Sequence, residues 1–275
     1  MTDKYAVIGN PIGHSKSPII HAAFARQTNQ DISYKAILAP LDGFEATVQS
    51  LIAQGYKGAN VTVPFKFQAL NLVLPSNRAL DEVAVNTLSF LGGEIRGDST
   101  DGTGLIRDIK QNLGITISGK RILLLGAGGA AEGVLHPLLN EAPNSLVIAN
   151  RTLDKAQSMV KKILANHAFV VSANAFDDMA DAQFDIVINA TSTGLTDTAL
   201  PIPSTIFAKN CLAYDMMYGR ETPFMAQARA ADAQVADGLG MLVEQAAEAF
   251  YIWRKVRPDT QPVIQMVRAL QMEKS

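Results

Sequence analysis

The sequence contains almost no cysteine and no long apolar run. Cys211 is the single cysteine among 275 residues, so no intrachain disulfide can form, and this fits a reducing cytosol. Cys211 begins an apolar strand-like run, which predicts a buried, unreactive thiol. No apolar stretch approaches the roughly 18 residues that a membrane span needs. The first residues enter a strand-like run without the pattern of a signal peptide. We therefore expect a cytoplasmic protein without a membrane segment.

The sequence also lacks an excess of either charge. Lys and Arg total 24 and Asp and Glu total 26, a formal net charge of −2, which gives no reason to expect nucleic acid or a membrane surface as partner. With 48% hydrophobic residues, the chain can build one large domain or two moderate ones. The polar segments contain no Cys/His cluster of the kind that binds a metal, so no metal site is predicted.

Short apolar runs alternate with helix-period segments, which favours an α/β fold with largely parallel strands. In the first third, the pattern predicts strands at 5–9, 33–38, 59–63 and 85–90, and helices at 18–28, 41–54 and 65–72. Ser17 and Pro18 predict a helix opened by a hydroxyl cap and a proline. Gly92 and Gly93 predict a turn.

A second α/β series follows a connector framed by Gly114 and Gly119. It predicts strands at 121–125, 146–150, 169–172, 185–189, 212–215 and 234–235, and helices at 103–112, 128–139 and 153–166. From Gly240 the chain reads as helical to its end. We expect two domains, one of residues 1–101 to which residues 240–275 return, and one of residues 102–239.

The sharpest general signal is the stretch "RILLLGAGGAAEGV", an apolar strand that runs into a glycine-rich turn. It fits G-x-G-x-x-G/A with Gly126, Gly128 and Ala131, and it also contains Ala127, Gly129 and Ala130. Gly126 permits the tight turn, Gly128 lets a pyrophosphate approach the backbone, and Ala131 allows close packing of helix on strand. The N–H groups of the helix N-terminus can then bind the anion. The stretch predicts a dinucleotide site in a Rossmann-type, doubly wound domain.

The next strand ends in "VIANRT", where NAD-binding folds usually carry an acidic residue for the ribose hydroxyl. Here Asn150, Arg151 and Thr152 occupy these positions, and Lys155 follows one turn later. Cations are disfavoured at a helix N-terminus unless an anion accompanies them. Arg151 and Lys155 can bind a 2′-phosphate. The segment therefore predicts NADP as cofactor in preference to NAD.

In the first domain, "GANVTVPFK" places polar side chains behind a lysine. Asn60 and Thr62 share one face of the predicted strand, and Lys66 opens the next helix. Other polar segments, "GHSKSP", "AVNTL" and "GDSTDG", also fall where strands end. Ligands bind beyond the carboxyl ends of strands in open α/β sheets. Hydroxyls, amides, one lysine and one aspartate suit a small polyhydroxylated acid as substrate.

These segments together carry a specific resemblance. The chain resembles the shikimate dehydrogenase family almost from end to end, because the family's motifs occur in the family's order as "NPIGHSKSP", "GANVTVPFK", "AVNT", "GDSTDG", "GAGGAA", "NRT", "NATSTG", "YDMMYG" and "ADGLGML". The resemblance implies the reduction of 3-dehydroshikimate to shikimate with NADPH, in the pathway to chorismate and the aromatic amino acids. It also implies that the N-terminal domain binds the substrate and that the Rossmann domain binds NADP, with a C-terminal helix returning to the first domain.

The resemblance also implies roles for individual residues. The catalytic pair would be Lys66 and Asp101. The substrate carboxylate would be bound by the hydroxyls of Ser15 and Ser17, with Tyr218 near it, and the ring and its hydroxyls by Asn60, Thr62, Asn86 and Gln245. The pyrophosphate would lie on Gly126, Ala127, Gly128, Gly129 and Ala130, the adenosine phosphate on Asn150, Arg151, Thr152 and Lys155, and the rest of the cofactor beside Thr191, Met216 and Gly238.

Two positions depart from the family's usual pattern. Lys155 stands where many members have arginine, which keeps the charge but loses the planar fork and weakens selectivity for NADP. Asn77 stands where an acidic residue near the nicotinamide is common, so it is left out of the predicted site.

Several functions remain open at this point. A dehydrogenase that also accepts quinate or prefers NAD is a close alternative. A folate-linked methylene dehydrogenase would not explain the serines of "GHSKS". A catalytically inactive sensor of NADPH would not need both Lys66 and Asp101. The sequence does not decide between a monomer and a homodimer.

Overall fold

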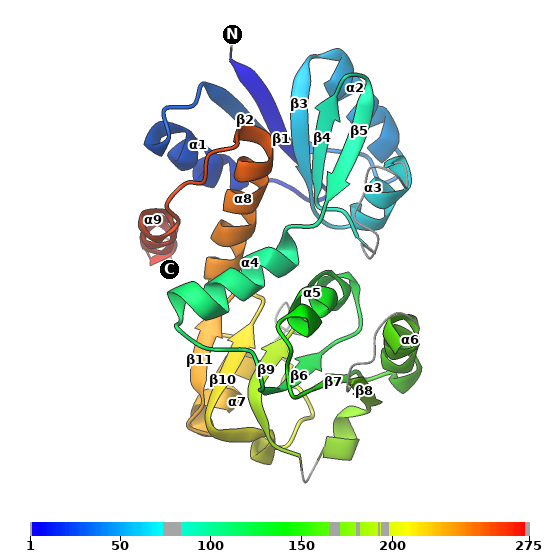
Figure 1. Cartoon of the computed structure of the whole chain (residues 1–275), viewed down its shortest axis with the longest axis vertical. Helices are drawn as coiled ribbons and strands as arrows, with labels where there is room; N and C mark the ends of the chain where they lie inside the picture. Colours follow the sequence, from blue (N-terminus) through cyan, green and yellow to red (C-terminus); the bar gives the residue numbers. More distant parts are fainter. Residues whose placement is uncertain are drawn as a thin grey trace. The chain divides into compact units, whose positions relative to one another are not determined.

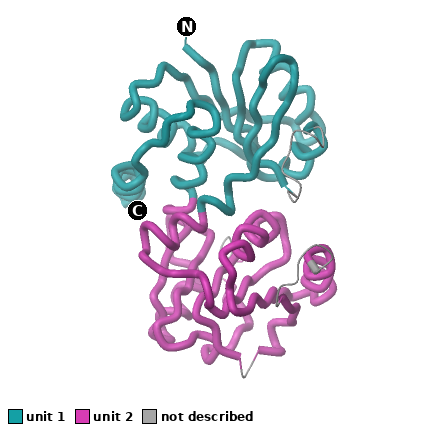
Figure 2. Tube along the Cα trace, viewed as in Figure 1, with its two compact units in different colours: residues 1–104, 242–275 teal, residues 105–241 magenta. Residues whose placement is uncertain are grey.

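The computed structural model describes residues 2–73, 84–164, 171–179, 182–191, 193 and 198–272. The chain forms two compact units (Figure 2). The first unit contains residues 1–104 and 242–275, and the second contains residues 105–241. Two helices contribute residues to both units, namely α4 (Asp101–Arg107) and α8 (Leu239–Arg254).

The first unit is an α/β structure around a five-stranded sheet (Figure 1). Its strands are β1 (Asp3–Gly9), β2 (Ile32–Leu38), β3 (Tyr56–Val61), β4 (Thr87–Leu91) and β5 (Glu94–Asp98). The other helices among its described residues are α1 (Ser17–Gln27), α2 (Phe44–Ala53), α3 (Lys66–Leu72) and α9 (Gln261–Met272).

The strand order of this sheet is β2-β1-β3-β4-β5. The pairs β1–β2 and β1–β3 are parallel, whereas β3–β4 and β4–β5 are antiparallel. The sequence did not predict β5, which follows the expected turn at Gly92 and Gly93, both at positive φ. The sheet is therefore mixed, and its antiparallel half places Asn86 and Asp98 at adjoining strand ends, with the Asn86 N–H donating to the Asp98 carbonyl.

Alternate residues of β1 and β3 face opposite layers of helices, as a period of two requires. Ala6, Ile8, Ala59 and Val61 belong to a buried cluster with the α2 and α3 side chains. On the other face, Tyr5 stacks on Trp253 of α8 with ring centroids 4.5 Å apart. Asn60 lies between Ala59 and Val61 and therefore faces the layer of α1 and α8. A polar side chain is thus buried at the centre of the unit.

The second unit contains six strands, which all pair in parallel. They are β6 (Arg121–Leu125), β7 (Ser145–Ala149), β8 (Val171–Asn174), β9 (Phe184–Asn189), β10 (Phe207–Asp215) and β11 (Gln234–Asp237). The α-helices are α5 (Gly129–Asn140), α6 (Leu153–Leu164) and α7 (Pro223–Ala230). The described residues of this unit also include a π-helical segment (Asp108–Asn112) and short 3-10 helices at Phe176–Met179 and Ser204–Ile206.

The strand order is β11-β10-β9-β6-β7-β8, which counted along the chain is the 3-2-1-4-5-6 order of the Rossmann fold. The order reverses between β6 and β9, and a dinucleotide binds beyond the strand ends at such a point. The predicted α/β fold class with a Rossmann-type domain is confirmed.

The predicted elements mostly exist, with differences at their ends. The helix expected at 103–112 begins at Asp101 and becomes π-helical at Asp108. Parts of the elements expected at 153–166 and 169–172 lie outside the described residues. None of the helices in the described part of the chain has the length and apolar character that a membrane span requires.

Candidate active site

The side chains of Lys66 and Asp101 meet in the first unit. Lys66 begins α3 after the turn in which the Phe65 N–H donates to the Thr62 carbonyl, and Asp101 begins α4. The Lys66 Nζ lies 2.5 Å from Asp101 Oδ2, and the two side chains are 22% and 14% exposed. A partly buried charged pair is shielded from water but can still reach a ligand. This pair can therefore exchange a proton with a bound molecule.

Asn86 holds the other oxygen of this carboxylate. The Asn86 Nδ2 donates to Asp101 Oδ1 over 2.9 Å and to Thr100 Oγ1 over 3.0 Å. The Asn86 Oδ1 accepts from the Thr100 backbone N–H and from the Thr87 hydroxyl. Asn86 is 3% exposed, so its orientation is set by buried partners. Asp101 is thus fixed through one oxygen by an amide and through the other by Lys66.

Asn60 belongs to the same polar network. Its Nδ2 donates to the Thr87 hydroxyl over 3.0 Å, and its Oδ1 accepts from the Tyr34 hydroxyl over 2.7 Å. The Tyr34 ring stacks on buried His21 with centroids 4.1 Å apart. Burial lowers the pKa of His21 to about 3, so the imidazole is neutral at pH 7. Asn60 is therefore held by protein partners at both its oxygen and its nitrogen.

The remaining predicted substrate residues of the first unit lie at loop and helix positions. Ser15 Oγ accepts from the Ser17 N–H over 3.3 Å, which leaves its hydroxyl hydrogen for a ligand. The predicted cap at Ser17 is wrong, because Lys16 is the N-cap residue and makes no side-chain cap. Thr62 follows the end of β3. Gln245 Oε1 accepts from the Thr100 hydroxyl over 3.4 Å and thereby joins the Asn86 network.

The glycine-rich turn in the second unit has the form that a phosphate cradle requires. Gly126 directly follows β6 and has a φ of +107°, and a β-carbon there would meet the Ala190 carbonyl oxygen at 3.1 Å. Gly128 is the N-cap of α5, and a β-carbon there would meet nothing within 4 Å. Gly129 and Ala130 form the first turn of α5, which has no side-chain cap. An anion can therefore approach the helix N-terminus without obstruction.

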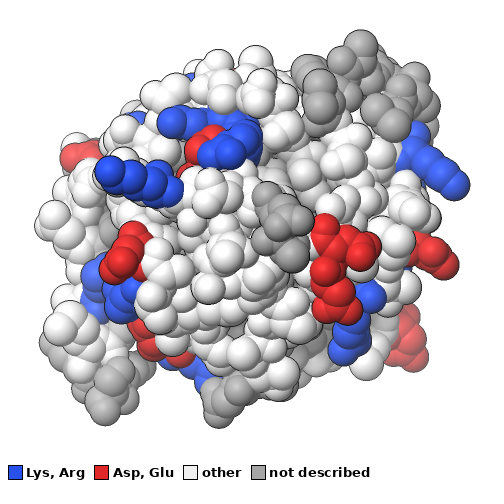
Figure 3. Space-filling model, turned by 90° about the horizontal axis from the view of Figure 1, so that it is seen from below, with Lys and Arg blue, Asp and Glu red and all other residues white. Residues whose placement is uncertain are grey.

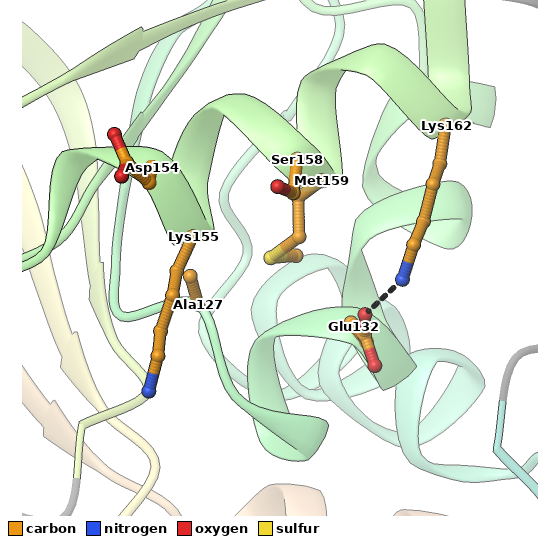
Figure 4. A pocket seen from close by; sticks show the side chains of 7 residues that line it. All are labelled: Ala127, Glu132, Asp154, Lys155, Ser158, Met159 and Lys162. Carbon is orange, nitrogen blue, oxygen red and sulfur yellow. Dashed lines mark hydrogen bonds and ion pairs between the residues drawn. The ribbon is translucent and has the colours of Figure 1, made fainter.

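The residues predicted for the adenosine phosphate gather at the end of β7. Asn150 follows the strand and donates its Nδ2 to the Thr152 carbonyl over 2.9 Å, while Arg151, Thr152 and Lys155 are exposed. Lys155 lines a cleft of about 270 Å³ between α5 and α6 (Figure 4). In this view the Lys155 ammonium group points past Ala127, and the Asp154 carboxylate points the other way. Lys155 is thus placed where it can meet a phosphate near the glycine turn.

The remaining predicted cofactor residues follow β9, β10 and β11. Thr191 donates to Asn189 Oδ1 over 2.7 Å. Met216 donates its N–H to the Asn189 carbonyl. A β-carbon at Gly238 would lie 2.2 Å from the Met216 oxygen, so only glycine fits. Tyr218, predicted near the substrate, lies in the loop after β10 and is half-buried, and burial raises its pKa.

Sequence reasoning missed the side chains that orient this site. Tyr34, Thr87 and Thr100 are hydrogen-bonded to Asn60 or Asn86, and the last two are buried. Thr100 belongs to the segment "GDSTDG" and Thr87 to "AVNTL", but nothing in the sequence indicates that both hydrogen-bond to Asn86. Asn77 lies outside the described residues. Among the described residues, no group of three or more His, Cys, Asp or Glu side chains is arranged to hold a metal.

Comparisons with protein families cover most of the chain. Residues 7–88 match the shikimate dehydrogenase substrate binding domain, residues 108–196 match shikimate / quinate 5-dehydrogenase, and residues 238–268 match the shikimate 5′-dehydrogenase C-terminal domain. The first match contains Lys66 and Asn86, and the second contains the glycine turn.

Individual relatives agree with these matches. The chain is 62% identical over 97% of its length to a protein of Methylobacillus flagellatus named shikimate dehydrogenase (NADP(+)), of which it covers 99%. An Ael1 enzyme from Pseudomonas putida is 46% identical, with a TM-score of 0.91 and coverage of 96% of this chain and 98% of that one. Shikimate 5-dehydrogenase from Thermus thermophilus, in complex with NADP(H) and shikimate, is 29% identical, with a TM-score of 0.86 and coverage of 98% and 99%.

These findings establish the class of protein first, an oxidoreductase that acts on a CH–OH group. Within that class, the chain belongs to the shikimate dehydrogenase family.

Proposed function

We propose that this protein interconverts 3-dehydroshikimate and shikimate with NADP(H), as a step in the synthesis of chorismate and the aromatic amino acids. The observation that carries the proposal is the 2.5 Å contact between Lys66 Nζ and Asp101 Oδ2. It joins a proton donor to a carboxylate that can orient it. Residues 1–101, to which residues 240–275 return, take the role of the substrate and catalytic domain, and residues 102–239 take the role of the NADP domain.

Lys66 acts at the reacting oxygen of the substrate. When bound, NADPH supplies the hydride that reduces the carbonyl carbon. The Lys66 ammonium group donates a proton to that oxygen and stabilises its negative charge as the charge develops. Asp101 orients Lys66 and accepts a hydrogen bond from a substrate hydroxyl. In the oxidative direction, neutral Lys66 takes the same proton back.

The polar side chains of the first unit match the substrate's groups. The Ser15 and Ser17 hydroxyls, with that of Tyr218, bind the carboxylate. The ring and its hydroxyls are bound by Asn60, Thr62, Asn86 and Gln245. Because a buried site with hydrogen-bonding groups strongly rejects an analogue that leaves them unpaired, these contacts favour a polyhydroxylated ring.

The second unit binds the cofactor through its strand ends. The pyrophosphate lies on the turn from Gly126 to Ala130, where the α5 N–H groups point outward. Arg151 and Lys155 bind the 2′-phosphate with Asn150 and Thr152, and this selects NADP over NAD. Thr191, Met216 and Gly238 border the rest of the cofactor.

Absorbance of NADPH provides the decisive test. The purified protein is mixed with shikimate and NADP, with shikimate and NAD, and with quinate and NADP. Formation of NADPH from shikimate at a much higher kcat/KM than in the other two arms is expected. Equal rates with quinate would make the protein a shikimate/quinate dehydrogenase. Absence of turnover in all arms, with NADPH binding retained, would favour a sensor and overturn the proposal.

In our proposal the main partner of this protein is a small molecule, and the protein acts in the cytoplasm. On the face drawn in Figure 3, basic and acidic side chains are interspersed, so that face offers no broad cationic surface for nucleic acid. The single cysteine suits a reducing compartment. We expect a monomer or a homodimer, which light scattering distinguishes.

A further inference from the structure

A buried carboxylate outside the catalytic pair lies at the carboxyl end of β10. Asp215 is the last residue of this strand and is 0% exposed. Burial raises its pKa, while hydrogen bonds from Thr222, Met217 and Asn189 lower it. Burying an acid is unfavourable unless donors surround it. The donors around Asp215 therefore indicate which parts of the structure it orders.

One side of the Asp215 carboxylate leads to the turn after β9. Asn189, which ends β9 and is 1% exposed, donates its Nδ2 to Asp215 Oδ2 over 3.2 Å. The Asn189 Oδ1 in turn accepts from both the N–H and the hydroxyl of Thr191, over 3.1 and 2.7 Å. Ala190 lies in the chain between Asn189 and Thr191, and its carbonyl oxygen faces Gly126. A β-carbon added to Gly126 would lie 3.1 Å from that oxygen. The amide of Asn189 thus connects Asp215 to the edge of the glycine turn.

The other side of the carboxylate leads to the loop after β10. Asp215 Oδ1 accepts from the Met217 N–H over 2.9 Å, and Oδ2 accepts from the Thr222 hydroxyl over 2.5 Å. The Thr222 oxygen then caps α7 by accepting from the Met225 N–H. The Met217 carbonyl accepts from the Gly238 N–H over 2.9 Å. One carboxylate therefore fixes both ends of the loop from Met216 to Thr222.

We propose that Asp215 is a positioning residue of the cofactor site, which sets the affinity for NADPH by ordering the turn at Thr191 and the segment at Met216 without touching the cofactor. The three residues proposed to border the cofactor, Thr191, Met216 and Gly238, follow three neighbouring strands, and Asp215 lies at the end of the middle one. This inference rests on the proposed NADP-dependent function.

The Asp215→Asn variant tests this role because it keeps the shape of the side chain and replaces one acceptor oxygen by an NH₂ donor. The new amide oxygen can still accept from the Met217 N–H. Its nitrogen then faces two donors, Asn189 Nδ2 and the Thr222 hydroxyl. If Asn189 turns its own oxygen toward it, the Thr191 N–H faces a nitrogen instead. We expect the Kd for NADPH, measured by fluorescence titration, to rise about tenfold, which corresponds to about 1.4 kcal/mol.

A second variant exchanges donor and acceptor. With Asp215→Asn and Asn189→Asp together, the carboxylate at position 189 accepts from the new amide and from both groups of Thr191. Only the Thr222 hydroxyl loses its acceptor. The pair is expected to recover most of the lost affinity, which a general loss of packing would not allow. If Asp215→Asn does not fold by circular dichroism, Asn189→Ala alone cuts the connection to Thr191 and is expected to weaken NADPH binding to a similar degree.

The matched control is Asp185→Asn at the opposite end of β9. Asp185 accepts from the Arg121 backbone and pairs with its guanidinium at 2.9 Å, away from the predicted cofactor residues. Loss of the Asp185–Arg121 ion pair is expected to lower the stability of the protein and to leave the Kd for NADPH unchanged. An unchanged Kd in Asp215→Asn, an equal weakening in Asp185→Asn, or no recovery in the exchanged pair would overturn the inference. Wild-type protein that does not turn over shikimate would instead contradict the proposed function.

Discussion

The Lys66 ammonium group and the Asp101 carboxylate are 35 positions apart in the sequence and 2.5 Å apart in the structure. Each begins a helix, and Asn86 holds the carboxylate oxygen that Lys66 does not contact. Lys66 is therefore oriented by Asp101, and Asp101 is oriented by both Lys66 and the buried amide of Asn86. The pair acts as one unit, and this has consequences for both single and double variants.

Removing the proton donor should slow the chemical step and leave substrate binding nearly intact. We expect Lys66→Ala to lower kcat by about 10²–10⁴, with a much smaller change in KM for shikimate. Steady-state kinetics with varied shikimate and saturating NADP measure both values. Lys57→Ala is the control, because Lys57 is an exposed lysine of β3. A rise in KM at unchanged kcat would make Lys66 a binding residue only.

The two members of the pair should show strong non-additivity. Asp101→Asn is expected to lower kcat/KM by about 10²-fold or more, because Lys66 loses its orienting charge and the substrate loses an acceptor. Combined with Lys66→Ala, it should add little, since groups that act as a unit are lost together. A double-mutant cycle on kcat gives the coupling. Additive losses would mean that the two residues act independently.

Selectivity for NADP should depend on Arg151. Its removal deletes a charge-assisted hydrogen bond to the 2′-phosphate, and such bonds contribute about 1.5–3 kcal/mol. We therefore expect Arg151→Ala to raise KM for NADP about 10- to 100-fold and to change KM for NAD little. Lys161→Ala on the exposed side of α6 serves as control. Equal losses with both cofactors would contradict a 2′-phosphate contact.

The stability of the first unit should decrease in acid because of His21. Burial lowers its pKa to about 3, whereas the unfolded chain has an ordinary value near 6.5. Below about pH 6.5 the unfolded state binds a proton that the folded state does not, so this contribution to stability falls progressively as the pH drops toward 3. The loss reaches at most about 5 kcal/mol at about 1.4 kcal/mol per pKa unit.

Urea unfolding between pH 7 and 4 measures this effect. The urea midpoint of wild type should fall faster with decreasing pH than that of His21→Phe, which has no titrating ring. Parallel curves for the two proteins would show that His21 does not carry the acid sensitivity.

The single thiol should be unreactive in the native protein. Cys211 is 0% exposed, and burial raises its pKa to about 12. The thiolate is the nucleophile, so an aromatic disulfide reagent at pH 8 should find no reactive thiol until denaturant is added. One equivalent should then react at once. Rapid labelling of the native protein would contradict the described burial.

The sequence predicted the second unit more fully than the first. An all-apolar strand followed by Gly126 and Gly128 is typical of a dinucleotide-binding turn, because only small residues permit the tight turn and the close approach of a pyrophosphate to the backbone. The first unit gave weaker local signals. Strand β5 (Glu94–Asp98) has two acidic residues and one arginine in five positions, and its stability comes from pairing with β4 and not from its own composition.

The candidate site was predicted only where family motifs mark it. The residues that orient it come from separate strands and are joined by hydrogen bonds that no local pattern encodes. Asp215 is an example, because an acid at a strand end usually lies at the surface, whereas here Asn189, 26 positions away, helps to bury it. The predicted helix cap at Ser17 was also wrong, because its hydrogen bonds too depend on a partner that the local pattern does not specify. Its hydroxyl is not used at the helix start, and its N–H instead donates to Ser15.

The first unit is built from both ends of the chain, and this affects how it can be made. Tyr5 stacks on Trp253, and Arg254 bonds to Asp3, 251 positions away. A ribosome releases residues 105–241 as one continuous stretch, so this stretch can complete its sheet during synthesis. One face of β1 stays uncovered until α8, with Trp253, has been translated. A message cut short before Trp253 would therefore yield a folded second unit attached to a sheet with one apolar face uncovered. Such a product is a natural target for chaperones and proteases.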